Sequence, residues 1–360
     1  MRLPSWAALV LSVCMPSIAV HRPGTHPVLS TIRTSAADCF TPPGLRNGKW
    51  AAENAWAFGF SAPSCKLSLA AVNFQELEVS EADRLMHMID GRWVVLMGDS
   101  NMRATYNQML VQLSVSPGVK IITAHGDTAE YYRAVKLSPG AGDSALASHL
   151  QGVQWGDQDA FVYNEKESTH TYLSLRFSNH FQHPVFPMAM KNWSQMHDGE
   201  SGAALHPAPQ FVDAVNGHHH SRRQATPSSV ILSPGLWHAF PLTECGTLDQ
   251  LMSNLEGSSA RSLFVTTGRI GWNPKLPDLW KRPVPDANAQ LKTVRDCAAK
   301  RTQLAPLKHG TLDLWAITQD ASIEWISCGG GYHYECASAA TPGPVASTLL
   351  RFIFEFAGSD

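Results

Sequence analysis

The sequence has few charged residues and no surplus of either sign. Charged residues make up 16% of the chain, and the formal net charge is −2 with the histidines counted neutral. A nucleic-acid-binding surface needs a basic excess, and an acidic tail needs a run of carboxylates. We therefore expect neither, and no nucleic acid among the partners. The 44% of hydrophobic residues indicates a globular protein rather than a disordered one.

Long apolar runs and closely paired cysteines are also missing. Beyond residue 20, no window is long and apolar enough for a membrane helix, so we expect no stable membrane span. No CxxC pair occurs, which disfavours a zinc site. The histidines at 218–220 lie in a polar stretch that we interpret as an exposed loop. We expect no metal and no cofactor.

The first 19 residues have the features of a secretory signal. Arg2 precedes an apolar run over Trp6–Val20, which is too short to span a bilayer. Ser17 and Ala19 fit the small-residue cleavage pattern, which places the cut after Ala19. We expect a secreted protein or one in the lumen of the secretory pathway, with an uncleaved Golgi anchor as the alternative.

Cysteine usage agrees with an oxidising compartment. Of seven cysteines, Cys14 lies in the signal, and the remaining even number is typical of a disulfide-bonded secreted protein. The sequence does not choose among the pairings, and we expect neighbours in sequence to be bonded: Cys39–Cys65, Cys245–Cys297 and Cys328–Cys336. Asn192 begins a glycosylation sequon, which is used only if the chain enters the secretory pathway.

Residues 20–90 read as an extension with a cysteine-containing lobe, and residues 91–358 as one large domain. Apolar runs predict strands at 93–97, 119–123, 172–177, 230–232, 263–267 and 312–317. Periodicity and caps predict helices at 81–89, from 100, from 247, at 286–301 and at 344–354. This alternation predicts an α/β fold with a mostly parallel sheet and helices on both faces.

One tripeptide, Gly98-Asp99-Ser100, lies where a predicted strand ends and a helix begins. That position puts a serine hydroxyl at the carboxyl edge of the sheet, where open α/β folds have their active sites. The first turn of a helix also offers backbone N–H groups to an oxyanion. The alternative is a plain turn in which Ser100 is the N-cap of the helix.

A serine nucleophile needs a base, and His333 is the best candidate. It follows three glycines inside the segment Cys328–Cys336, after the last predicted strand and before the closing helix. A loop there can reach the carboxyl edge of the sheet. The alternative is a surface or packing histidine, and His238 is a second choice for the base.

The segment Gly98–Arg103, with Tyr106 and Leu110 beyond it, resembles block I of the PC-esterase and trichome-birefringence-like proteins of the SGNH hydrolase superfamily. The segments around Cys39–Cys65, Val230–Trp237 and Gly331–Tyr334 resemble their cysteine-rich lobe, third block and histidine block. The resemblance implies a flavodoxin-like SGNH three-layer sandwich. It also implies an O-acyltransferase or carboxylic-ester hydrolase, because family members move acetyl groups onto cell-wall polysaccharides or hydrolyse esters.

The resemblance also implies roles for single residues. Ser100 attacks an acyl carbonyl, and His333 removes its proton. Ser233 stands where the third block has an oxyanion-hole asparagine, and Gly126 is a weak match to the glycine of block II. Apart from the resemblance, the helix spacing places Arg103 one turn after Ser100 on the same face. Three roles are open for it: holding the nucleophile loop, contacting an anionic substrate, or forming a structural ion pair.

One departure affects the catalytic triad. Gly330 stands where the family has the aspartate that orients the histidine. Three alternatives follow: a working Ser–His dyad, an orienting acid supplied by Asp320, Glu324 or Glu335, or a degenerate enzyme. The expected partner is accordingly a glycan or another acyl-ester substrate, acted on by a polysaccharide O-acetyltransferase or acetylesterase. The alternative is a catalytically degenerate glycan-binding protein on the same fold.

Overall fold

The computed structural model describes the parts of the chain that build one sheet and the helices against it. The described residues are 38–40, 45, 48–50, 60–62, 65–69, 72–74, 76–126, 135–137, 157–177, 227–233, 260–266, 268, 309–321 and 342–359. The helices are η1 (Asp38–Phe40, a 3₁₀ turn), α2 (Val79–Met88), α3 (Ser100–Ser114), α10 (Leu314–Thr318) and α11 (Pro344–Gly358). The strands are β1 (Lys49–Trp50), β2 (Phe60–Ser61), β3 (Trp93–Gly98), β4 (Val119–Gly126), β5 (Val135–Leu137), β6 (Asp157–Asn164), β7 (Thr169–Phe177), β8 (Ser229–Ser233), β9 (Arg261–Val265) and β10 (His309–Leu312).

Within these ranges, eight strands form one mixed, mostly parallel sheet in the order β10-β9-β8-β3-β7-β6-β4-β5. The neighbours from β10 to β7 pair in parallel. The neighbours from β7 to β5 pair antiparallel. The α/β class is therefore confirmed, with an antiparallel extension that the strand pattern did not predict.

The five parallel strands follow a simple order when they are numbered along the chain. β3 comes first, then β7, β8, β9 and β10, so their spatial order is 2-1-3-4-5. β3 is thus central, between the second and third strands, and all six of its residues are buried. That burial explains why Trp93–Gly98 is an apolar run without alternation.

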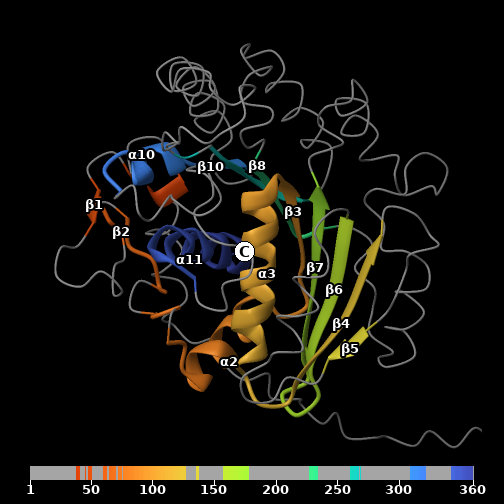
Figure 1. Ribbon diagram of the computed structural model, residues 1–360. Coiled ribbons are helices and arrows are strands. Elements are labelled where there is room, and N and C mark those ends of the chain that lie inside the picture. Colours follow the sequence, from red (N-terminus) through yellow and green to blue (C-terminus); the bar gives the residue numbers. More distant parts are fainter. Residues whose placement is uncertain are drawn as a thin grey trace, which may run out of the picture.

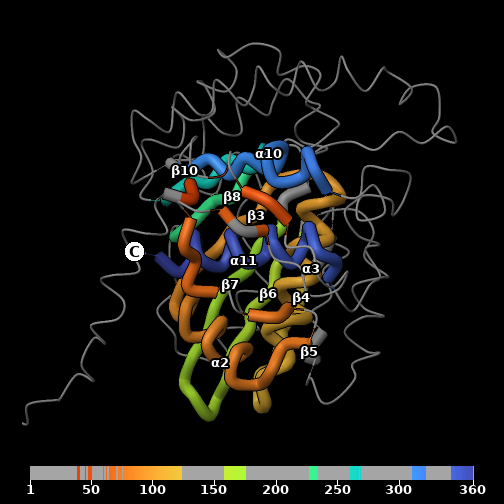
Figure 2. Tube along the Cα trace, turned by 90° about the vertical axis from the view of Figure 1, so that its left-hand side faces the viewer, coloured from red at the N-terminus to blue at the C-terminus, as the bar shows by residue number. Residues whose placement is uncertain are grey.

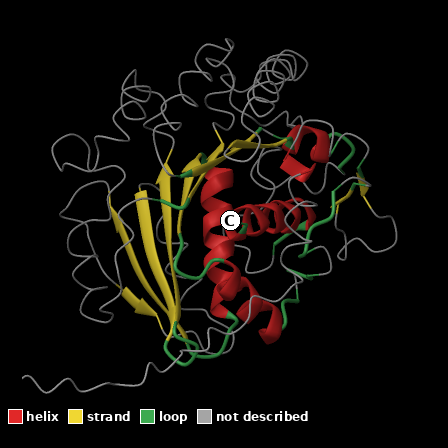
Figure 3. Ribbon diagram, turned by 180° about the vertical axis from the view of Figure 1, so that it is seen from behind, coloured by secondary structure: helices red, strands yellow, loops and turns green. Residues whose placement is uncertain are grey.

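The described long helices α2, α3 and α11 cover the same face of the sheet (Figures 1 and 3). Because strand side chains alternate between the two faces of a sheet, every second residue of β3 faces these helices. Val94 and Leu96 are on this face, since they belong to the same buried hydrophobic cluster as residues of α11. A separate buried cluster of Ile122, Phe161 and Tyr163 lies on the other face. The helices predicted from 247 and at 286–301 fall outside the described residues.

The predicted strand at 312–317 is wrong in its second half. β10 ends at Leu312, and Leu314–Thr318 forms the short helix α10. The side chain of Asp313 caps this helix, because its Oδ1 accepts a hydrogen bond from the backbone N–H of Ala316 at 3.0 Å. A short buried apolar run fits a strand or a helix equally well, and here the cap decides for the helix.

The segment before α2 is tied to the rest of the protein by a disulfide and by its side chains. The predicted Cys39–Cys65 disulfide is present. Phe40 packs edge-on against Phe352 and Phe356 of α11, with ring centroids 6.1 and 5.3 Å apart. Cys39, Phe40 and the buried residues up to Phe74 belong to the same hydrophobic cluster as the sheet. The expected lobe and the expected large domain therefore share one core.

Two arginines bind the carboxyl end of α11. Arg261 Nη1 donates to the carbonyl oxygens of Phe356, at 3.1 Å, and Ser359, and its guanidinium carbon lies 4.5 Å from the centre of the Phe356 ring. Arg92 donates to the carbonyl oxygens of Gly358 and Ser359 at 3.2 and 3.3 Å. The last carbonyls of a helix have no partner within it and carry partial negative charge, so these contacts stabilise α11.

We therefore expect Arg261→Met to lower the free energy of unfolding by about 2 kcal/mol, since charge-assisted hydrogen bonds are lost while the apolar stem stays. Urea unfolding measures the loss. Arg92→Met, which removes the longer hydrogen bonds, should cost less. Equal losses for the two variants, or no loss for Arg261→Met, would contradict this account.

Candidate active site

Ser100 lies at the carboxyl edge of the sheet. β3 ends at Gly98, and the register pairs Gly98 with Ser233, the last residue of the neighbouring strand β8. Ser100 begins α3, and the short helix α10 follows β10 at the same edge. Figures 1 and 2 show α10 near the upper end of the coloured, described elements and α2 near their lower end. The structure therefore brings two of the predicted site residues, Ser100 and Ser233, to adjacent strand ends.

Gly98 allows β3, β8 and α3 to approach closely at this point. A Cβ atom added to Gly98 would lie 2.6 Å from the backbone oxygen of Ser233. It would also lie 2.5 Å from Cγ of Met102. No side chain larger than hydrogen fits there without a shift, so the glycine of the tripeptide is required by packing. Ser233 itself is buried, with 6% of its surface exposed.

Asp99, not Ser100, is the N-cap of α3. Asp99 has an extended backbone, and its Oδ1 accepts a hydrogen bond from the backbone N–H of Asn101 at 2.9 Å. Ser100 is the first residue of the helix and is partly exposed. The alternative in which Ser100 serves as the N-cap is therefore wrong, because the neighbouring carboxylate performs that role.

Arg103 lies one turn into α3. Its backbone N–H donates to the carbonyl oxygen of Asp99 at 3.0 Å. Burial lowers the pKa of the Arg103 guanidinium, and the negative charge of Asp99 acts in the opposite direction. The choice among the three expected roles of Arg103 stays a prediction.

Gly126 is not brought next to Ser100. Gly126 ends β4 at the same edge, but β7 and β6 lie between β4 and β3. Three strand spacings amount to about 14 Å, which is beyond hydrogen-bonding reach of an oxyanion at Ser100. Asp320 is exposed in the turn after α10, and its role as an orienting acid stays a prediction because His333 lies outside the described residues.

The other predicted site residues lie outside the described residues. They are His333, Glu324, Glu335, Asn192, Cys245, Cys297, Cys328 and Cys336. The second-choice base His238 and the histidines at 218–220 also fall there. The candidate site is thus defined by Ser100, its turn and Ser233, and the base stays a prediction.

No protein-family model, curated protein or solved structure matches this chain. In the described ranges, no helix is long and apolar enough to cross a membrane. The same ranges hold no cluster of three side chains suited to a metal ion.

A buried carboxylate at the same edge was missed from the sequence. Asp313 directly follows β10 and has 7% of its surface exposed. Besides capping α10, its Oδ1 accepts a hydrogen bond from the hydroxyl of Thr266, the residue after β9, at 3.4 Å. An acidic residue between a strand and a helix is a recognisable cap signal, but the assignment of 312–317 to one strand hid it. Its role here is to fix the start of α10.

Proposed function

We propose that this protein performs acyl-ester chemistry on glycans with Ser100 as the nucleophile, as an SGNH-type O-acetyltransferase or acetylesterase. The observation that carries the proposal is the position of Ser100. It begins α3 at the carboxyl end of the central strand, beside the end of β8. Ligand sites of open α/β sheets occur at this edge, where the strand order reverses.

The strand order supports the flavodoxin-like SGNH architecture. The order 2-1-3-4-5 is that of flavodoxin-like sheets, whose order reverses between the first and third strands. In this chain those strands are β3 and β8, the two that end in Gly98 and Ser233. The helices after the first and last parallel strands, α3 and α11, lie on one face and contact each other. The antiparallel strands β4–β6 are then an insertion between the first two parallel strands.

The cap at Asp99 limits which groups can stabilise an oxyanion. The backbone N–H of Asn101 is already bound to Asp99, so the residue after the nucleophile does not donate. In our proposal the N–H of Ser100 itself and the hydroxyl of Ser233 donate to the oxygen of the attacked carbonyl. A serine hydroxyl supplies one such hydrogen bond, in the place where the resembling family has an asparagine.

The proposed reaction has two steps. Ser100 Oγ attacks the acyl carbonyl while His333 accepts its proton, and the alcohol leaves with a proton from His333. The acyl group is then transferred from Ser100 Oγ to water in an esterase or to a sugar hydroxyl in a transferase, and His333 takes the proton of that acceptor and returns it to Ser100. Asp320, Glu324 or Glu335 orients His333 in one form of the proposal, and a Ser–His dyad without an orienting acid is the simplest arrangement. The Cys39–Cys65 disulfide supports a secretory-pathway location for this activity.

A covalent fluorophosphonate probe tests the nucleophile, because only an activated serine reacts with it at an appreciable rate. We expect intact-mass analysis to show one adduct per chain, and peptide mapping to place it on Ser100. Ser100→Ala should abolish labelling and change the free energy of unfolding by less than about 0.5 kcal/mol, because Asp99 supplies the cap.

Ser114→Ala is the matched control at the other end of the same helix, and it should label like the wild type. An adduct on another serine, or equal labelling of Ser100→Ala, would remove Ser100 as the nucleophile. A folded wild type that takes up no probe would favour the degenerate glycan-binding protein.

A further inference from the structure

The short helix α10 has one side packed in the core and one side directed away from it. Leu314, Ile317 and Ala321 are spaced by three and four residues, and all belong to the main hydrophobic cluster. Trp315 and Gln319, four residues apart, share the remaining side, which we call the outer face of α10. Trp315 is partly exposed and Gln319 is exposed. A large aromatic ring therefore lies outside the core, beside a polar amide.

The indole of Trp315 has no polar or aromatic partner in the part of the chain that the structure describes. Its backbone N–H donates to Oγ1 of Thr266 at 3.2 Å, but its indole N–H makes no hydrogen bond, and neither a ring nor a cation contacts it. Trp50, which also contacts α10, shows the contrast. Its indole N–H donates to the carbonyl oxygen of Ile317 at 2.9 Å. Its ring meets Phe60 edge-on and packs against the core cluster. A tryptophan that packs a fold normally finds such partners, so packing does not explain Trp315.

The backbone that carries Trp315 is fixed on several sides. The Asp313 carboxylate caps α10 through the backbone N–H of Ala316 at 3.0 Å. The hydrogen bond to Thr266 ties the helix to the end of β9, and the hydrogen bond from Trp50 ties it to β1. A ring on such a rigid backbone binds a ligand without a further cost of ordering the helix.

Trp315 lies at the same edge of the sheet as the proposed nucleophile. β3 and β10 both belong to the parallel half of the sheet, so they end at its carboxyl edge, where Ser100 and α10 follow them. β10 is three positions from β3 in the strand order, which amounts to about 14 Å. A ligand that reaches Ser100 and Trp315 together is therefore a chain of several sugar units rather than one sugar.

We propose that the outer face of α10, with Trp315 as its main contact, is a binding subsite for a neutral oligosaccharide chain whose reacting unit lies at Ser100. The flat face of an indole suits the C–H face of a sugar ring, and the indole N–H and an amide suit its hydroxyl groups. Residues 313–321 contain no lysine or arginine that would select an anionic sugar. The inference rests on the proposed function, since it concerns the glycan that reaches Ser100.

Binding to a glycan array tests the subsite, with Ser100→Ala as the background so that no acyl group is transferred. The array carries neutral oligosaccharides of increasing length and the matching monosaccharides. We expect the background protein to bind at least one oligosaccharide, and to bind its monosaccharide more weakly. Trp315→Leu keeps an apolar side chain but removes the ring, so its affinity for that oligosaccharide should fall roughly tenfold or more. Trp315→Phe keeps a flat ring and should lose less.

A control variant and melting curves make the result specific. Val79 is an apolar residue at the start of α2 with 45% of its surface exposed, and Val79→Ala should bind like the background. Melting curves identify the temperature at which every variant is folded, and binding is compared there. Three results overturn the subsite: a background protein that binds no oligosaccharide, a Trp315→Leu variant that binds like the background, or equal losses for Trp315→Leu and Trp315→Phe.

Fluorophosphonate labelling of the wild type separates a failure of this inference from a failure of the proposed function. An adduct on Ser100, with unchanged binding in Trp315→Leu, overturns the subsite and leaves the nucleophile. No adduct on Ser100, with binding lost in Trp315→Leu, overturns the nucleophile and leaves the sugar-binding face, as in the degenerate glycan-binding protein.

Discussion

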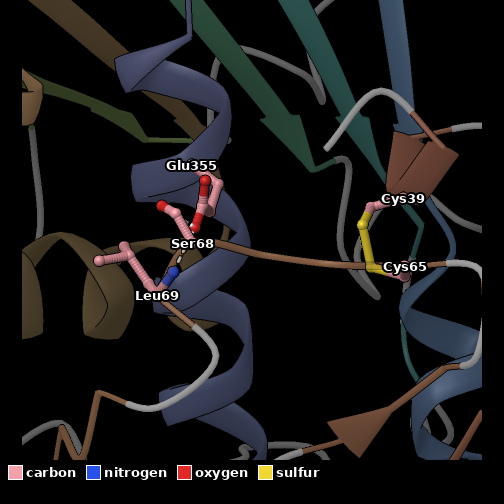
Figure 4. Close-up of a disulfide and its surroundings, with 5 residues drawn as sticks. All are labelled: Cys39, Cys65, Ser68, Leu69 and Glu355. Atoms are coloured by element: carbon pink, nitrogen blue, oxygen red, sulfur yellow. Dashed lines mark hydrogen bonds between the residues drawn. A yellow bond between two sulfur atoms is a disulfide. The ribbon is translucent and has the colours of Figure 1, made fainter. Parts of the chain in front are cut away.

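Replacing Glu355 with alanine is expected to lower the free energy of unfolding by about 3–5 kcal/mol, because two hydrogen bonds to a buried carboxylate are lost, each worth roughly 1.5–3 kcal/mol. The Glu355 carboxylate accepts hydrogen bonds from the Ser68 hydroxyl and from the Leu69 backbone N–H, each at 2.5 Å (Figure 4). Glu355 is 3% exposed. Water cannot readily replace the carboxylate, so the Leu69 N–H would be left buried without an acceptor.

A second charge raises the cost. Arg351 lies one turn before Glu355 on α11 and is 7% exposed. Burial lowers the pKa of its guanidinium, and the charge of Glu355 opposes that effect. Arg351 also donates to the backbone oxygen of Val72 at 2.9 Å. Glu355→Ala would remove the hydrogen bonds from Ser68 and Leu69. It would also weaken the hydrogen bond from Arg351 to Val72, because the buried guanidinium of Arg351 would lose a nearby carboxylate.

Urea unfolding of three variants checks this account. Ser68→Ala removes one hydrogen bond from the same carboxylate and should cost about 1 kcal/mol. Glu355→Gln keeps an oxygen acceptor but not the charge, so its loss should fall between those of the other two. If Glu355→Ala costs no more than Ser68→Ala, the carboxylate does not hold the segment as we describe.

The central part of the fold could be predicted because its signals are local. Trp93–Gly98 is a continuous apolar run, and α3 repeats apolar residues every three or four positions, so the strand-turn-helix around Ser100 was visible in the sequence. The alternative that made Ser100 the N-cap was wrong for a physical reason. Asp99 and Ser100 are both favoured caps, and only the backbone geometry shows that Asp99 fills the role.

The antiparallel half of the sheet could not be predicted in the same way. β6 and β7 form a hairpin over Asp157–Phe177, and β4 pairs with β6 rather than with a parallel neighbour. A strand's own residues show that it is buried but do not say which strand it pairs with. The match of Gly126 to a site glycine failed on this point, because β4 follows β3 in the chain yet lies three strands away in the sheet.

Contacts between segments far apart in the chain could not be predicted from the sequence, for a related reason. Leu69 and Glu355 are 286 residues apart in the sequence, and neither belongs to a motif. A lone glutamate on an apolar helix and a leucine in a loop each have many local explanations. Their pairing follows only from the packing of the N-terminal segment against α11.

The second large effect is expected for Gly98→Ala, which should lower the free energy of unfolding by about 3 kcal/mol or more and slow the labelling of Ser100. The added methyl group would lie 2.6 Å from the Ser233 backbone oxygen and 2.9 Å from the Met102 Cβ. Neither atom is the end of a flexible side chain. Relief of the overlap therefore requires β3, β8 and the start of α3 to move apart.

Gly310→Ala is a matched control in the same sheet. A methyl group there would meet side-chain carbons of Leu263, Phe356 and Phe40, each at 3.2 Å. A few tenths of an ångström of movement in those side chains relieves the contact, so a loss of about 1 kcal/mol is expected, at the low end for added core volume. The comparison separates crowding against the backbone from crowding against side chains, since both variants add one methyl group to a strand.

The two measurements on Gly98→Ala test two separate claims, one about packing at the end of β3 and one about the reactivity of Ser100. Urea unfolding reports whether β3, β8 and α3 are packed as closely as the distances require, and a loss no larger than that of Gly310→Ala would contradict this packing. The labelling rate of the folded variant reports whether that packing positions Ser100. If stability falls while folded Gly98→Ala labels as fast as the wild type, the close approach of Ser233 serves only to hold the sheet together. A slower rate, with Gly310→Ala unchanged, would mean that the spacing between the ends of β3 and β8 sets the reactivity of Ser100.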